Sequence, residues 1–215
     1  MSRWPVKITL GAGLVILFFA ILSFGFTNPF QEIIPKQKRH SGKGLYITAT
    51  VAQSRKMFDQ IKTKAKKCGL DTFVIDAKWQ LEKPLLELVK NHQLNSGTKV
   101  TPEAWLTKLC QQLHQEGFIV TARIVVFKDD HLVIARPDLS IKMPGGSLYR
   151  DRKGGRYSNP YAPEVRLFNE LIAERAALSG VDEIQFDYIR FPAEGAAREL
   201  SFPEEEQGVS RVEII

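Results

Sequence analysis

The sequence has little cysteine and little histidine, with 2 and 4 of these residues among 215. Cys68 and Cys110 are too few for a disulfide framework, and both fall in predicted amphipathic helices, where cysteine usually packs as a small hydrophobic residue. No histidine follows a predicted strand, and none has the spacing of a zinc ligand set. The sequence therefore favours a protein without a metal or other cofactor.

Three familiar signatures are also missing. No Gly-x-Gly-x-x-Gly follows a predicted strand, which disfavours a dinucleotide-binding fold, and no Gly-x-Ser-x-Gly elbow indicates a serine hydrolase. The net charge of +6 is not gathered into a long basic block. Its densest cluster, Lys62, Lys64, Lys66 and Lys67, falls on the polar face of one predicted helix. Such a face is typically solvated, so we predict no nucleic-acid partner.

A long apolar segment is present near the N-terminus. Residues 8–26 carry no charge, and as a helix they nearly match the hydrocarbon thickness of a bilayer. A cleaved signal peptide is the alternative, but its apolar core is usually shorter and no Ala-x-Ala cleavage site is evident. We predict a membrane anchor over residues 1–26 and a linker over 27–42. Basic residues flank both ends of the apolar run, so charge alone leaves its orientation open.

From residue 43 onward, predicted strands and helices alternate, which predicts an α/β fold with a parallel sheet. Long loops follow the second and third strands, whereas the helix-to-strand turns are short. This asymmetry favours a TIM-type (β/α) barrel over a doubly wound sheet, because barrel active sites are built from loops after the strands. The predicted strands cover 44–50, 72–77, 118–126 and part of 180–192, and the predicted helices cover 53–68, 102–117 and 163–179.

Only about four βα units are visible, whereas a closed barrel has eight. Near the C-terminus, Ser210 and Glu213 have capping-box spacing and precede two isoleucines, which predicts the start of another helix. A frayed tail is the alternative. We expect residues 43–215 to form a partial barrel that a C-terminal half-barrel would complement, with an inactive fragment as the other interpretation.

The segment 180–192 is the most informative stretch. It reads as one strand with Glu183, Gln185 and Asp187 on one face and apolar residues between them. Polar residues in register on a parallel strand are typical of a barrel strand near its active site. The alternative is a half-exposed antiparallel strand with a salt-bridged aspartate.

Three carboxylates, Asp76, Asp129 and Asp187, follow or end successive predicted strands. If the strands are parallel neighbours, the three side chains meet at one rim. Hydrolysis of a glycosidic bond needs two carboxyl groups, so these residues are the candidate catalytic residues. Asp76 and Asp129 have a second interpretation as helix N-caps. A divalent cation held by the three is a less favoured alternative.

Basic and aromatic residues close to these acids are candidates for binding substrate. Cations near a carboxylate lower its pKa, although they also form purely structural ion-pair networks. Loop aromatics stack on sugar rings, but they also anchor loops. The candidates are Arg190, Tyr188, Arg123, Lys128, Lys78 and Tyr161.

Five motifs together resemble a bacterial family of glycoside-hydrolase-like domains: residues 43–49, 73–78, 122–129, 136–138 and 182–192. The resemblance implies a TIM-like barrel distantly related to the α-amylase clans, held outside the cytoplasm by a membrane anchor. It implies a glycan substrate such as a cell-envelope or extracellular polysaccharide. It also implies that Asp187 is the nucleophile and that the acid/base comes from a later strand.

The sequence departs from the family pattern after Lys78. Trp79-Gln80-Leu81-Glu82 replaces an acidic, glycine-containing turn, which weakens the case for a catalytic Asp76. The missing half-barrel and the loop aromatics leave an alternative function, that of a non-catalytic, membrane-tethered carbohydrate-binding or interaction module.

Overall fold

A computed structural model describes residues 42–90, 99–193, 200–202 and 209–214. The chain divides into two compact units, residues 1–39 and 40–215, and all described residues belong to the second. Within these ranges no helix has both the length and the apolar character needed to cross a membrane. The predicted anchor over 1–26 lies outside the described residues, as does the linker up to residue 41.

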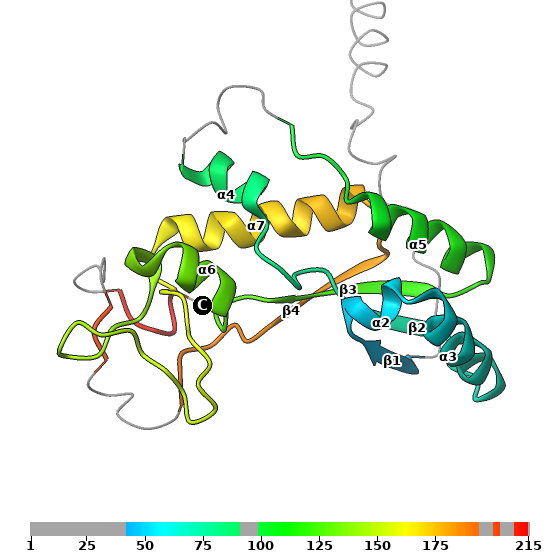
Figure 1. Ribbon diagram of the computed structural model, residues 1–215, viewed down its shortest axis with the longest axis horizontal. Helices are drawn as coiled ribbons and strands as arrows, with labels where there is room; N and C mark the ends of the chain where they lie inside the picture. Colours follow the sequence, from blue (N-terminus) through cyan, green and yellow to red (C-terminus); the bar gives the residue numbers. More distant parts are fainter. Residues whose placement is uncertain (1–41, 91–98, 194–199, 203–208, 215) are drawn as a thin grey trace, which may run out of the picture. The chain divides into compact units, whose positions relative to one another are not determined.

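The domain is built on four parallel strands in the order β1-β2-β3-β4. This arrangement confirms the predicted parallel α/β fold, and it shows that the antiparallel interpretation of the last strand is wrong. Figure 1 shows β3 and β4 running side by side. The strands are β1 (Gly44–Ile47), β2 (Thr72–Asp76), β3 (Ile119–Val125) and β4 (Glu183–Asp187).

Three predicted helices are present as α3 (Arg55–Lys67), α5 (Ala104–Gln115) and α7 (Pro163–Leu178). The first predicted strand was too long. It ends at Ile47, and α2 (Ala49–Gln53) follows because the Thr48 hydroxyl accepts the Val51 N–H at 3.4 Å and caps the helix. The predicted strand continued past Thr48 because the residues of this segment favour strands.

The two long loops also contain helices that the sequence analysis missed. α4 (Lys83–Lys90) lies over α7, and its buried Leu85, Leu86 and Val89 explain why this segment is helical. After β3, α6 (Asp130–Ala135) leads into the short 3-10 helix η2 (Pro137–Leu139). These helices fold against the core, so only part of each predicted loop is irregular.

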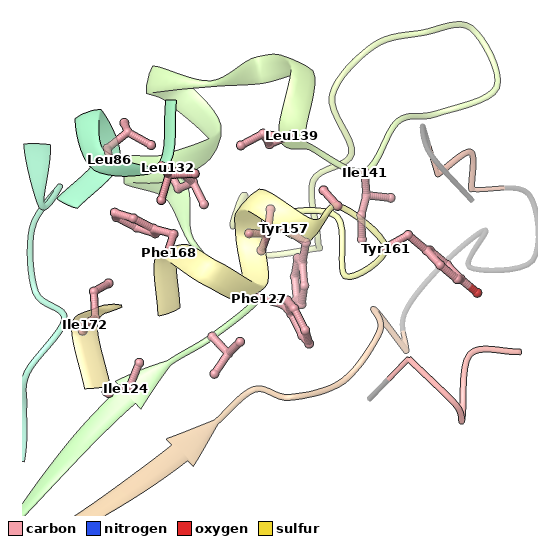
Figure 2. Packing of buried hydrophobic residues seen from close by; sticks show 14 of the residues in the cluster. Leu86, Ile124, Phe127, Leu132, Leu139, Ile141, Tyr157, Tyr161, Phe168 and Ile172 are labelled. Atoms are coloured by element: carbon pink, nitrogen blue, oxygen red, sulfur yellow. The ribbon is translucent and has the colours of Figure 1, made fainter. Parts of the chain in front are cut away.

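The helices bury one face of the sheet in two apolar clusters. In the first, Phe73 of β2 packs between Phe58 and Phe118, with ring centroids 5.2 and 4.8 Å away. The second lies around α7, where Figure 2 shows Phe168 and Ile172 beside Ile124 of β3. Because side chains alternate along a strand, the opposite face carries the polar residues.

The polar face is the one that the sequence analysis predicted for the last strand. Ile184 packs against the apolar core, whereas Gln185, next along the strand, is exposed. Register places Gln185 beside Arg123 of β3, and Arg123 beside Asp76 of β2. Tyr46 of β1 is 49% exposed. A row of polar side chains therefore crosses all four strands.

The predicted capping box near the C-terminus is present. The Ser210 N–H donates to the Glu213 carboxylate at 2.7 Å, and the Glu213 N–H donates to the Ser210 hydroxyl at 3.3 Å. Residues 211–213 form a turn. The reciprocal bonds satisfy two backbone donors, as in the first turn of a helix.

Candidate active site

Arg123 joins two of the three predicted catalytic carboxylates. Its Nη1 donates to Asp76 Oδ1 at 2.7 Å, and its Nε and Nη2 donate to Asp187 Oδ2 at 2.8 and 2.6 Å. Tyr46 completes the group, because its hydroxyl donates to the other oxygen of Asp76 at 2.6 Å. These four residues come from four neighbouring strands and form what we call the Arg123 cluster.

The parallel register explains this arrangement. Asp76 and Asp187 are the last residues of β2 and β4, and β3 lies between those strands. Arg123 on β3 is the register partner of Asp76, and it lies two residues before Val125, the partner of Asp187. Its long side chain therefore reaches the carboxyl ends of both neighbours.

The cluster holds Asp187 as a carboxylate. Partial burial alone would raise the pKa of Asp187, but hydrogen bonds from Arg123 and from the Tyr188 N–H outweigh burial and lower it below its usual value. The pKa of Arg123 is raised: burial opposes its charge, but the hydrogen bonds to Asp76 and Asp187 prevail. The Asp187 side chain keeps 39% of its surface exposed, so an ionised carboxylate faces solvent.

The lowered pKa of Asp187 makes stability depend on pH. Such a group contributes stability above its unfolded pKa of about 3.9 and loses that contribution as the pH falls through the folded value. We therefore expect Asp187→Asn to lower the urea midpoint more at pH 7 than at pH 2, because the contribution of the Asp187 carboxylate falls as acidification protonates it. Equal destabilisation at both pH values would contradict this account.

Asp129 does not join the Arg123 cluster. Its Oδ1 accepts the Leu132 N–H at 2.9 Å and caps α6, and its Oδ2 lies 2.6 Å from Lys78 Nζ. Both side chains are almost fully buried, at 5% and 6% exposure. The interpretation of Asp129 as an N-cap thus describes its position, and the expectation that three carboxylates meet at one rim was wrong for this residue.

Lys78 is a buried structural cation. Besides Asp129, its ammonium group donates to the carbonyls of Val125 and Val126 at 2.9 and 3.1 Å and to Asn169 Oδ1 at 2.8 Å. Burial lowers the pKa of Lys78 despite the attraction of Asp129. Lys78 therefore ties β3 to α7, and its nearly buried ammonium group is already bound within the protein, which argues against a role in binding substrate.

A second group of predicted residues adjoins Asp187. The Lys128 ammonium lies 5.4 Å from the ring centroid of Tyr188 and forms an ion pair with Asp151 at 2.6 Å. The Arg190 guanidinium lies 5.4 Å from the same ring. Tyr188 thus lies against two cations immediately after Asp187, in a geometry that favours cation–π attraction.

Tyr188 has an unusual backbone. Its φ is +53°, and among the described residues no other non-glycine has a positive φ. A bulky side chain in this left-handed region costs on the order of 1–3 kcal/mol, and such residues gather at functional sites. The conformation lets the Tyr188 N–H donate to Asp187 Oδ1 at 2.7 Å. The strained residue thus helps to orient the carboxylate.

Tyr161 has a structural environment. It is 4% exposed and packs against Phe191 and Phe202, with both ring centroids 5.7 Å away. Figure 2 shows Tyr161 together with Tyr157 in the buried cluster. The prediction that Tyr161 stacks on a sugar ring needs an exposed ring, so burial argues against it, and the alternative of a loop anchor fits its position.

Sequence reasoning missed two members of these groups. Tyr46 has a weak signal, because it shares its strand face with the other polar positions. Asp151 has none, since it comes from a glycine-rich loop 23 positions from its partner Lys128.

Among the described residues no three His, Cys, Asp or Glu side chains are grouped as metal ligands. Arg123 binds both Asp76 and Asp187, so its guanidinium occupies the position that a metal ion held by these two carboxylates would take.

Comparison with known proteins shows which family this is. Residues 44–215 match the family model described as "Putative glycosyl hydrolase domain". The chain belongs to this family. The matched range includes every residue of the Arg123 cluster. A search of curated protein sequences found no match.

Solved structures resemble this chain to different degrees. A hypothetical protein from Ruminiclostridium thermocellum is 26% identical with a TM-score of 0.62, over 79% of this chain and 86% of that one. The α-galactosidases of Lactobacillus brevis and Thermus thermophilus are each 16% identical, with TM-scores of 0.46 and 0.45. They cover 69% and 70% of this chain, which spans only 20% and 32% of their lengths.

Proposed function

We propose that this domain hydrolyses glycosidic bonds with Asp187 as the nucleophile. The observation that carries the proposal is the Arg123 cluster, because it holds Asp187 ionised, oriented and partly exposed at the carboxyl end of a parallel strand. A retaining glycosidase needs such a carboxylate to attack the anomeric carbon and form a covalent glycosyl-enzyme. Membership of a glycosyl hydrolase family supports the same chemistry.

The second carboxyl group of the mechanism must protonate the leaving oxygen, and in a retaining enzyme it lies about 5–5.5 Å from the nucleophile. Asp76 is poorly suited to this task, since its side chain is 15% exposed and both its oxygens accept hydrogen bonds, from Arg123 and from Tyr46. We place the acid/base outside the described residues. A complementing half-barrel beside β4 would supply it, because β4 pairs only with β3 in the described sheet.

The location of the domain follows from the N-terminal sequence. We propose that residues 8–26 anchor the chain in a membrane and that the domain faces the cell envelope or the exterior, where a polysaccharide is its substrate. The uncharged 19-residue run and the family resemblance support this. Protease digestion of cells stripped of their outer layers and of lysed cells tests it: the domain should be digested in both, and protection in the stripped but unlysed cells would contradict it.

Replacing the nucleophile is the direct test. Asp187→Asn should reduce hydrolysis of a polysaccharide panel by at least about 1,000-fold and leave glycan binding within about twofold, since the amide keeps the shape but cannot attack. The matched control is Asp138→Asn, because Asp138 forms a surface ion pair with Arg136. Release of reducing sugar measures the first effect and calorimetry the second. Undiminished cleavage by Asp187→Asn would overturn the assignment.

One observation favours a second function, that of a non-catalytic carbohydrate-binding module. Arg123 compensates both Asp76 and Asp187, as in a purely structural ion-pair network. A binding module would bind glycans without cleaving them, and Asp187→Asn would then leave every measured property except stability unchanged.

A further inference from the structure

Four exposed cationic side chains lie in two segments near the proposed nucleophile. Arg150, Arg152, Lys153 and Arg190 are all exposed, and none of these side chains forms an ion pair or a hydrogen bond within the described ranges. We call these four residues the basic rim. Three of them lie in one turn of the loop between η2 and α7, and the fourth follows β4.

A chain of contacts connects this turn to Asp187. The turn closes where the Asp151 N–H donates to the Gly155 carbonyl at 2.9 Å. Asp151 binds Lys128 at 2.6 Å, and Lys128 lies against the ring of Tyr188, the residue after Asp187. Lys128 passes close to the backbone of this turn, since a Cβ at Gly155 would lie 2.6 Å from Lys128 Cε. The turn that carries three residues of the basic rim is therefore linked through Lys128 and Tyr188 to Asp187.

The acids of this segment do not neutralise the basic rim. Residues 127–162 contain seven Lys and Arg against four Asp, a net charge of +3. Each Asp is already committed to another cation, so the excess positive charge is concentrated at the turn. The pairs are Asp129–Lys78, Asp130–Arg156, Asp138–Arg136 and Asp151–Lys128.

We propose that the basic rim binds the acidic groups of an anionic glycan and so selects acidic polysaccharides for the site at Asp187. The inference rests on the proposed function and names its substrate class. Arginine side chains bind carboxylate and sulfate groups through paired hydrogen bonds, and uncompensated positive charge beside a site attracts anionic ligands. Arg190 also stacks on the ring of Tyr188, so its guanidinium is positioned before ligand arrives.

Binding of matched polymers by the full chain tests the proposal. Calorimetry at low ionic strength compares neutral dextran, dextran sulfate, polygalacturonate and single-stranded DNA. We expect one of the two acidic glycans to bind at least about tenfold tighter than dextran and DNA, and the tighter one shows whether sulfate or carboxylate is preferred. Replacing the four rim residues by Gln should lower that affinity at least about tenfold, with binding weakened further by salt.

The matched control removes four exposed cations of α3 by the same substitution, at Arg55, Lys56, Lys64 and Lys67. It should change affinity by less than about twofold. Equal binding of dextran, equal binding of DNA, or an equal loss in the control would overturn the proposal. Cleavage of neutral glycans without any acidic preference would overturn it and leave the proposed hydrolase intact, whereas acidic-glycan binding without cleavage would overturn the hydrolase alone.

Discussion

Replacing Lys78 by methionine is expected to lower the free energy of unfolding by about 3–5 kcal/mol, the usual cost of removing one partner of a buried ion pair. Methionine fills a similar volume, so the loss comes from Asp129, which stays buried at 5% exposure without its cation. Two backbone carbonyls and Asn169 also lose a donor. Urea denaturation of the full chain measures the change.

A second substitution tests the cause. Asp129→Asn removes the charge but keeps a good N-cap for α6, so the double variant should regain at least half of the loss. Lys56→Met, on the exposed surface of α3, is the control and should change stability by less than about 0.5 kcal/mol. A loss below about 1 kcal/mol for Lys78→Met would show that the pair is not structural.

Replacing Arg123 by methionine is expected to reduce glycan hydrolysis on the order of 100-fold, because the nucleophile loses both its orientation and its counter-charge. Without Arg123, burial and the nearby carboxylate of Asp76 raise the pKa of Asp187. The acidic limb of the pH profile should therefore move to higher pH, since Asp187 becomes protonated earlier as the pH falls. Measuring kcat/KM against pH on the polymer that the wild type cleaves reports this shift.

Two further variants separate electrostatics from misfolding. Adding Asp76→Asn to Arg123→Met removes the like charge and should move the acidic limb partly back towards the wild type. Arg136→Met, which breaks the surface pair with Asp138, should leave the profile unchanged. An unaltered acidic limb in a folded Arg123→Met protein would mean that Arg123 does not control Asp187.

The sequence predicted the site only in part. The alternation of Glu183, Gln185 and Asp187 was sufficient to place them on one strand face, because period-two alternation is a local property of the chain. Asp129 and Lys78 could not be placed in this way. Both follow strands, as active-site residues do, and only packing showed that they are buried together under α6 and α7.

Several features of the fold depended on information that local patterns do not carry. α4 and α6 are short helices inside segments that were predicted to be loops. α4 is helical because its apolar residues pack against the core, and α6 begins where Asp129 caps it. The strained φ of Tyr188 has no sequence signature, because tyrosine normally avoids that region.

The sequence by itself determined the alternation of the four strands with α3, α5 and α7, the parallel sheet and the polar face of β4, because hydrophobic periodicity indicates which side of an element is buried. Only the tertiary structure decided which charges meet. Asp76, Arg123 and Asp187 are separated by 47 and 64 positions, and the register of three parallel strands brings them within hydrogen-bonding distance. Such pairing depends on distances between strands, which no single segment of the chain specifies.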